Sequence, residues 1–251
     1  MKIALTFDIE RDIPNVLDTS FGIEFGLVKI LKILDDFNIK GTFFCTGNIA
    51  NRLPKYIKLI IRQGHEIACH GLNHERLTKL DFEECEEIIT QNKKILEKVS
   101  QSSEIIGFRA PYLKVPNYLF IILKNQGFKY DSSINHNSIH ILKNSHGING
   151  EIQEFHPNLN IIFRLPLSYS PLRKWIYKKE LLVLYVHPWE AIEMRSLLFN
   201  QIELSDILKN ALFRPDRWIN TGDMFLYRFK SFIRETLSKK AEFVMLKQLV
   251  K

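Results

Sequence analysis

The sequence predicts an α/β fold in which parallel strands form the centre and helices lie outside, as in an α/β barrel. Short apolar runs alternate with helical patterns along the chain, and this alternation is typical of parallel sheets. The chain has 251 residues, an ordinary length for one barrel, and 45% of them are hydrophobic, enough for a sizeable core. No repeat or low-complexity segment interrupts the pattern, so we expect one domain over residues 1–251.

The expected strands are short and apolar, and most of them end beside a polar side chain. In chain order they cover residues 3–7, 41–45, 65–69, 105–108, 127–130, 161–165 and 181–186. The segment 135–160 is rich in Asn, His, Ser and Gly, which predicts a loop or hairpin there.

Helices are expected between these strands. Apolar side chains recur at helical spacing over residues 25–37. Pro54 opens a second helix, at a position where its missing N–H costs nothing, and Gly64 is placed to end it. Asp81 and Glu84 resemble a capping box at the start of a long helix. The remaining expected helices cover residues 116–125, 202–213 and 222–237.

Polar side chains that can carry chemistry follow the strands. They are Asp8, Glu10, His70, Arg109, Asp131 and His187. The carboxyl ends of parallel strands meet at one rim, and α/β barrels build their active sites there. Six independent placements on one rim predict a functional site more strongly than any single motif does.

The ends of the first and third strands supply the materials of a divalent-metal site. Asp8 and Glu10 end the first strand, and His70 and His74 follow the third. Catalytic zinc sites use about three protein ligands and leave a position open for water. Glu10 or Asp8, with the two histidines, can fill these places. The other carboxylate would stay free to accept a proton.

The later strand ends supply candidate catalytic groups. Arg109 could hold the free carboxylate through its guanidinium, and the backbone N–H of Tyr112 could stabilise an oxyanion. His187 could protonate a leaving amine, with Asp131 as the acidic partner that sets its pKa.

Composition sets broader expectations. The three cysteines, Cys45, Cys69 and Cys85, lack C-x-x-C spacing, which favours free thiols in a reducing compartment. Cys69 precedes His70 and could be a soft ligand, but strand neighbours face opposite sides, so we expect it to point away from the site. No apolar run is long enough for a membrane span and no signal peptide is evident, so we expect a cytoplasmic protein.

The net charge of +7 is concentrated late in the chain, in the basic part of residues 191–251. A basic surface can meet nucleic acid, anionic lipid headgroups or phosphorylated substrates, or can simply be a solvated helix face. We expect no nucleic acid and no specific protein partner, and we retain peripheral membrane contact as a hypothesis.

Several segments within residues 1–190 together resemble the polysaccharide deacetylase superfamily. The matching segments are Thr6-Phe7-Asp8-Ile9-Glu10, Gly41-Thr42-Phe43-Phe44, His70-Gly71-Leu72-Asn73-His74, Arg109-Ala110-Pro111-Tyr112, Asp131-Ser132-Ser133 and Leu184-Tyr185-Val186-His187-Pro188. The resemblance implies a distorted (β/α) barrel with about seven strands. It also implies a divalent metal, usually zinc, and hydrolysis of an N-acetyl group on an amino sugar.

By the same resemblance, Asp8 is the base, His70 and His74 bind the metal, and Arg109 holds the base. Tyr112 is the oxyanion donor, and His187 is an acid steadied by Asp131. This sequence departs from the family pattern at Ile9, where a second aspartate usually binds the metal. Glu10 fits the Asp-x-Glu variant of the motif and would take that ligand's place.

Three functions remain open from the sequence. The first is removal of an N-acyl group from an amino sugar in a glycan, glycolipid or nucleotide-sugar precursor, including phosphorylated or lipid-linked substrates. The second keeps the site but acts on a non-sugar amide such as a ureide or imide. The third is a catalytically inactive carbohydrate-binding barrel, which only the Ile9 substitution favours.

Overall fold

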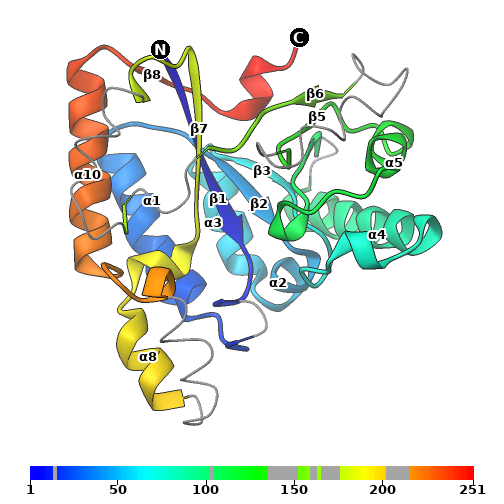
Figure 1. The fold of residues 1–251 in the computed structure, drawn as a ribbon, viewed down its shortest axis with the longest axis horizontal. Helices are drawn as coiled ribbons and strands as arrows, with labels where there is room; N and C mark the ends of the chain where they lie inside the picture. The colour runs from blue at the N-terminus through cyan, green and yellow to red at the C-terminus, as the bar shows by residue number, and fades with distance from the viewer. Residues whose placement is uncertain (14–15, 102–104, 135–151, 159–162, 165–175, 202–214) are drawn as a thin grey trace.

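A parallel sheet forms the centre of the computed structural model, and helices surround it (Figure 1). The structure describes residues 1–251 except 14–15, 102–104, 135–151, 159–162, 165–175 and 202–214. Both ends of the chain lie at the top of Figure 1, and β1 runs downward from there. The parallel sheet is curled and surrounded by helices, a distorted (β/α) barrel, as the sequence predicted.

The strands of the sheet all pair in parallel. They are β1 (Lys2–Ile9), β2 (Thr42–Cys45), β3 (Glu66–Cys69), β4 (Gly107–Phe108), β5 (Tyr130–Asp131), β6 (Gln153–Glu154), β7 (Leu181–Val186) and β8 (Glu242–Phe243). Their order is β6-β5-β4-β3-β2-β1-β7, and β8 pairs with the beginning of β1. The central position of β1 places its carboxyl end between those of β2 and β7.

The helices match most of the sequence-based expectations. Their bounds are a π-helical turn at Gly22–Gly26 (η1), α1 (Leu27–Asp36), α2 (Gly47–Arg52), α3 (Pro54–Arg62), α4 (Phe82–Ser100), α5 (Leu119–Asn125), α8 (Met194–Gln201) and α10 (Asp223–Ser238). Short 3-10 turns are η2 (Leu77–Lys79), η3 (Pro111–Leu113), η5 (Pro188–Ala191), η7 (Pro215–Arg217) and η8 (Leu246–Leu249). None of the described helices is long and apolar enough to cross a membrane.

Two helix-end predictions are confirmed in detail. The carboxylate of Asp81 accepts from the backbone N–H of Glu84 at 2.9 Å, and Glu84 accepts from the N–H of Asp81 at 3.0 Å. This reciprocal pair is a capping box. Gly64 has a φ of +78°, the left-handed conformation that glycine adopts without strain just after a helix.

Two expected segments fall wholly or largely outside the described residues, and two short strands were not predicted. The strand predicted at 161–165 falls largely outside the described residues, and its described part, residues 163–164, is a turn. The helix predicted at 202–213 also lies outside them. Strand β6 occurs inside the predicted loop, and β8 was missed. Each of these strands is two residues long, too short to show an alternating pattern.

Side chains of each strand alternate between an outer and an inner face. On β1, Ile3, Leu5 and Phe7 belong to the large cluster packed under the helices, while Ala4 belongs to a separate inner cluster. Phe229 of α10 packs edge-on against Phe7 in the outer cluster. The even-numbered positions of β1 therefore face the barrel interior, which directs Asp8 inward as well.

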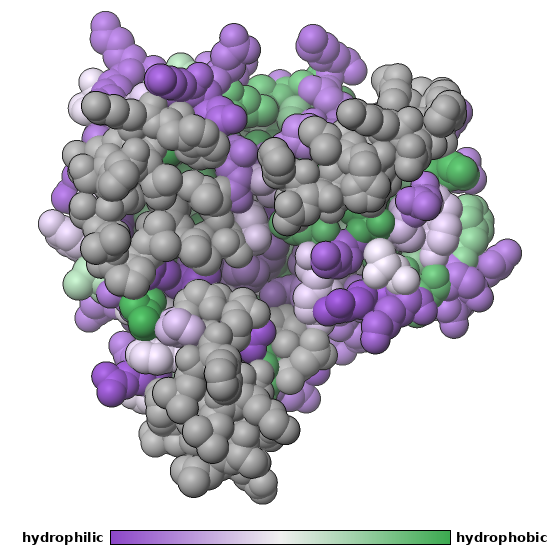
Figure 2. Space-filling model, viewed as in Figure 1, coloured by the Kyte–Doolittle hydropathy of each residue, from purple (hydrophilic) through white to green (hydrophobic). Residues whose placement is uncertain are grey.

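The visible described surface in the view of Figure 1 is mainly hydrophilic, with apolar residues scattered among charged ones (Figure 2). Scattered apolar residues of this kind are normal on protein surfaces. This face therefore gives no separate support to the membrane hypothesis, which remains a prediction.

The loop after β7 packs closely against η1 at two glycines. A Cβ on Gly26 would lie 2.1 Å from the carbonyl oxygen of Pro188, and one on Gly22 would lie 2.5 Å from the nitrogen of Trp189. Both contacts are with backbone atoms of η5, which cannot move aside as a flexible side chain can. Because these two residues have no side chain, η1 can pack directly against the backbone of the loop that begins at His187.

We expect Gly26→Ala to lower the free energy of unfolding by about 1–3 kcal/mol, because the new methyl group forces η1 and η5 apart. Urea denaturation measures this change. The exposed Lys29→Ala substitution on α1 is the matched control and should lie within about 0.5 kcal/mol of the wild type. Equal stability of Gly26→Ala and the wild type would show that this close packing is absent.

Candidate active site

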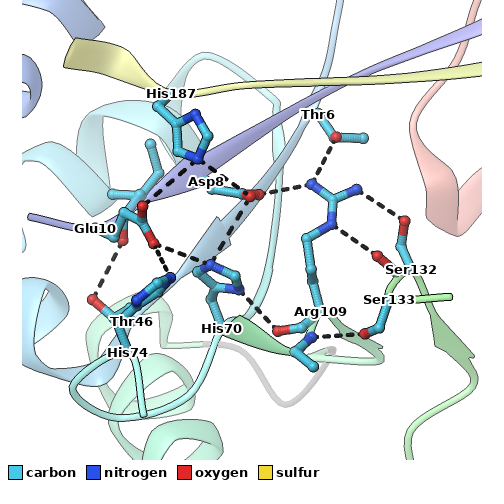
Figure 3. A network of polar contacts seen from close by, with 12 residues as sticks. Thr6, Asp8, Glu10, Thr46, His70, His74, Arg109, Ser132, Ser133 and His187 are labelled. Carbon is cyan, nitrogen blue, oxygen red and sulfur yellow. Dashed lines mark hydrogen bonds and ion pairs between the residues drawn. The ribbon is translucent and has the colours of Figure 1, made fainter. Parts of the chain in front are cut away.

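Glu10, His70 and His74 converge at the carboxyl ends of β1 and β3 (Figure 3). One potential ligand atom from each side chain lies within 4.8 Å of the other two. Oε2 of Glu10 is 2.5 Å from Nε2 of His74 and 3.3 Å from Nε2 of His70. That oxygen is buried and, among the described groups, has no partner with hydrogen-bond geometry. A buried carboxylate oxygen facing two imidazole nitrogens fits a divalent cation.

His70 is oriented for metal binding by a second contact. Its Nδ1 lies 2.8 Å from the carbonyl oxygen of Arg109, and a carbonyl can only accept. The contact therefore puts a proton on Nδ1, so Nε2, on the side of Glu10, is the ring nitrogen that can bind a metal ion when it is deprotonated. Metal-binding histidines commonly use their other ring nitrogen in this way.

The neighbouring charges also favour an ionised Glu10. Burial alone would raise its pKa, but the charge of His74 and the contact with His70 outweigh burial and hold the pKa well below its usual range. Glu10 thus remains an anion, the form in which a carboxylate binds metal.

Asp8 is held separately by Arg109. Nη1 of Arg109 donates to Oδ1 of Asp8 at 2.7 Å and to Oγ1 of Thr6 at 2.9 Å. Its Nε and Nη2 donate to the carbonyl and hydroxyl oxygens of Ser132, both at 2.9 Å. The guanidinium is fully buried and lies 4.1 Å from the ring centre of Phe44. The other oxygen of Asp8 stays directed to the centre of the site, 4.0 Å from Nε2 of His70.

His187 faces the same centre from the end of β7. Its Nε2 lies 3.6 Å from Oε1 of Glu10 and 3.9 Å from Oδ2 of Asp8. Its Nδ1 lies 3.1 Å from Oε1 of Glu190, which also accepts the backbone N–H of His187 at 3.0 Å. Burial disfavours the charged imidazole, but the contact with Glu190 and the charges of Glu10 and Asp8 raise the pKa of His187.

Glu190, rather than Asp131, is therefore the acidic partner of His187, and our expectation for Asp131 is wrong. Tyr130 belongs to the inner cluster and Ser132 bonds to Arg109, so the residue between them faces the opposite side of β5. The carboxylate of Asp131 instead accepts from the hydroxyl and backbone N–H of Ser133, at 2.6 and 3.0 Å. Ser133 in turn accepts the N–H of Ala110 at 2.7 Å, so Asp131 supports the Arg109 loop indirectly.

Sequence reasoning missed Glu190 altogether. The available signal was an acid three residues after His187, beyond the turn-forming Pro188. Glu190 is fully buried, and Nε of Arg164 donates to its second oxygen at 2.7 Å. Arg164 was also missed, because it lies in the segment predicted as a strand without a polar motif.

Tyr112 lines the pocket above these groups, beside His74. The two rings are 4.3 Å apart, and Tyr112 has a φ of +59°, a left-handed conformation that costs energy for a residue with a side chain. His74 also has a positive φ, of +63°. Such conformations persist where surrounding structure enforces them, and they are common at functional sites.

The cysteine expectation fits the structure. Cys69 is buried in the outer cluster, on the opposite face of β3 from His70. Burial raises the pKa of its thiol well above the ordinary value, which makes it a poor metal ligand. Cys45 and Cys85 are also free and buried.

Comparison with known proteins identifies the family. A family model described as polysaccharide deacetylase matches residues 1–130, just over half of the chain. The chain belongs to the polysaccharide deacetylase family. The family match covers Asp8, Glu10, both histidines and Arg109, but ends before His187.

Two curated relatives show how similar the sequence is to other members of the polysaccharide deacetylase family. A peptidoglycan deacetylase from Helicobacter pylori is 26% identical over 117 residues, which are 47% of this chain and 40% of that protein. A peptidoglycan-N-acetylglucosamine deacetylase from Bacillus cereus is 30% identical over 115 residues, 46% of this chain and 36% of that protein. The matches thus span well under half the length of these curated relatives.

A solved structure extends the likeness of fold to the whole chain. A family 4 carbohydrate esterase from Bacillus anthracis superimposes with a TM-score of 0.59 and 17% sequence identity. The superposition covers 99% of this chain and 82% of the esterase. The part of the chain that follows the family match, including β7 and His187, therefore also has this fold.

We expect Glu10→Ala, His70→Ala and His74→Ala each to weaken zinc binding by more than the roughly 10–100-fold typical of outer-shell changes. Each substitution removes a converging ligand atom. Elemental analysis after dialysis against zinc measures the bound metal.

Asp8→Asn is the matched control because it changes a carboxylate that Arg109 already holds, and it should keep about one zinc per chain. Zinc lost with Asp8→Asn but kept with Glu10→Ala would reverse the assignment of the two carboxylates.

The pKa of Glu154, on β6, can be tested through the pH dependence of stability. Burial and the adjacent charge of Asp131 raise its pKa well above the usual value. The stability gained by keeping its proton is therefore present below pH about 4 and is lost as the pH rises toward the raised pKa.

Glu154→Gln keeps a neutral side chain at every pH, so its Tm should increase relative to the wild type between pH 4 and pH 8. A change of about 1 kcal/mol corresponds to roughly 2–4 °C for a chain of this size. Exposed Glu83→Gln is the control and should show no such trend. A Tm difference between Glu154→Gln and the wild type that is constant with pH would contradict the raised pKa.

Proposed function

We propose that this protein is a metal-dependent hydrolase that removes an N-acyl group, chiefly N-acetyl, from an amino sugar in a glycan, glycolipid or nucleotide-sugar precursor. The main support is the separation of two carboxylates within one rim. Glu10 converges with two histidines, while Asp8 is held by Arg109 beside them. The relatives described as peptidoglycan deacetylases support this reaction and class of substrate.

The donor set fits zinc or a similar borderline cation. Two imidazoles and one carboxylate are the ligand types of catalytic zinc sites, and Oε2 of Glu10 is buried and faces both imidazoles. Glu10, His70 and His74 would hold this ion. When bound, it would polarise the amide carbonyl and make an attacking water more acidic.

The remaining groups are placed for proton transfer. Asp8 presents its free Oδ2 to the centre of the site and would accept the proton of the attacking water. Arg109 fixes this carboxylate and, through its carbonyl, His70. His187 presents Nε2 to the same centre, with Nδ1 held by Glu190, and would donate a proton to the departing amine. The backbone N–H of Tyr112 would stabilise the oxyanion.

Acetate release from N-acetylated chitooligosaccharides by zinc-loaded protein tests this proposal. We expect turnover in the wild type and a fall in kcat of about 10²–10⁴-fold in Asp8→Asn, the range that a general base contributes. Asp36→Asn, which changes an exposed carboxylate paired with Lys32, is the matched control and should keep full activity.

Two outcomes would contradict the proposal. Hydrolysis of a ureide or imide without acetate release from any acetylated sugar would favour an amidohydrolase acting outside carbohydrates. Tight binding of the oligosaccharide by zinc-loaded protein without turnover would favour a carbohydrate-binding barrel.

A further inference from the structure

The pocket over the site is lined by two arginines that the proposed chemistry does not use, Arg164 and Arg217. Arg164 lines this pocket, although its side chain is only 2% exposed. Its Nε is taken by Glu190, as described above. Its Nη1 is buried, and no group within the described part of the chain hydrogen-bonds to it. A buried donor left unmatched costs about 1–3 kcal/mol, more when the group is charged.

Holding Glu190 does not account for this arrangement. The two oxygens of Glu190 are already satisfied by Nε of Arg164 and by His187. The ion pair therefore needs only one edge of the guanidinium. The Nη1 donor remains for another partner, and Arg164 is one of the residues that line the pocket.

Trp189 contributes a second unmatched donor at the same place. Its Nε1 is buried and, among the described residues, lacks a hydrogen-bond partner. The indole ring lies between the imidazole of His187, 5.2 Å away in a stacked arrangement, and the guanidinium of Arg164, 5.0 Å away. Arg217 of η7 lines the same pocket and adds another positive charge.

The acidic groups that line the pocket already have partners. Asp8 is paired with Arg109, and Glu10 faces the two histidines. Arg164 and Arg217 bring two guanidinium groups to the same lining, and a guanidinium favours an oxyanion as its hydrogen-bond acceptor. An arginine fork with a neighbouring indole N–H suits the several oxygens of a carboxylate or phosphate.

We propose that Arg164, Trp189 and Arg217 form a subsite for an oxyanion carried by the substrate, a carboxylate or a phosphate. This inference rests on the proposed function and narrows it: the substrate is an acylated amino sugar with an anionic group near the acylated nitrogen. The anion satisfies the unmatched donors of Arg164 and Trp189 and sets the orientation of the sugar over the metal ligands.

Three sugars test the preference and distinguish the source of the anion. They are N-acetylglucosamine, N-acetylmuramic acid, which carries a carboxylate, and N-acetylglucosamine 1-phosphate. One charge-assisted hydrogen bond contributes about 1.5–3 kcal/mol, which corresponds to roughly 10–100-fold. We expect kcat/KM of zinc-loaded wild type to be higher by this factor for one of the two anionic sugars than for the neutral one.

Two variants connect this preference to the subsite. Arg164→Lys keeps a positive charge beside Glu190 but lacks the guanidinium fork. Arg217→Gln changes a partly exposed residue, so this substitution should not destabilise the fold as a change in the core would. Each should reduce the ratio of anionic to neutral kcat/KM by about 10-fold or more, mainly through KM. Arg62→Gln, an exposed arginine of α3, is the control and should leave the ratio unchanged.

A merely structural role of Arg164 would lower kcat/KM equally for neutral and anionic sugars, and that result would overturn the proposal. Equal kcat/KM for all three sugars in the wild type would also overturn it while leaving the deacetylase proposal intact.

Calorimetric titration separates failure of the subsite from failure of the proposed function. Zinc-loaded Asp8→Asn protein is titrated with the same three sugars, so that binding is measured without dependence on turnover. Tighter binding of an anionic sugar, lost with Arg164→Lys in the same background, supports the subsite even if the wild type deacetylates none of them. Equal affinity for all three sugars contradicts the subsite.

Discussion

The site depends on the buried guanidinium of Arg109. Four hydrogen bonds join it to Asp8 and Thr6 on one side and to both oxygens of Ser132 on the other. Its backbone carbonyl fixes the ring of His70. A charge with no exposure is tolerated only when it is paired and hydrogen-bonded, so the ends of β1, β3 and β5 must keep their relative positions. One residue thereby positions both Asp8 and His70.

Alternation along the strands explains why the other groups meet. Asp8 shares the inner face of β1 with Ala4, and His70 shares the inner face of β3 with Ala68. The odd-numbered neighbours Phe7 and Cys69 pack outward under the helices. Each apolar layer that stabilises the barrel therefore also directs a polar side chain to the rim. Apolar side chains on one face of each strand stabilise the barrel, and polar side chains on the other face form the candidate site.

Much of this arrangement could be predicted from the sequence. The strand ends that carry Asp8, His70, Arg109 and His187 were evident from short apolar runs followed by polar residues, and the structure brings these four together. Asp131 could not be oriented in this way. Both faces of its strand are buried, so apolar alternation does not reveal which face is inner. The contact of Glu190 with Arg164 was hidden for another reason, because it depends on a tertiary approach of two segments far apart in the chain.

The central claim is that Arg109 reserves Asp8 for proton transfer and leaves Glu10 to bind the metal. A crystal structure of the zinc-loaded protein, with anomalous scattering measured at the zinc edge, tests it most directly. The account predicts zinc at about 2.0–2.2 Å from Glu10, His70 and His74, with Asp8 still paired to Arg109 and outside bonding distance. Zinc bound to Asp8, with Glu10 turned away from the ion, would contradict it.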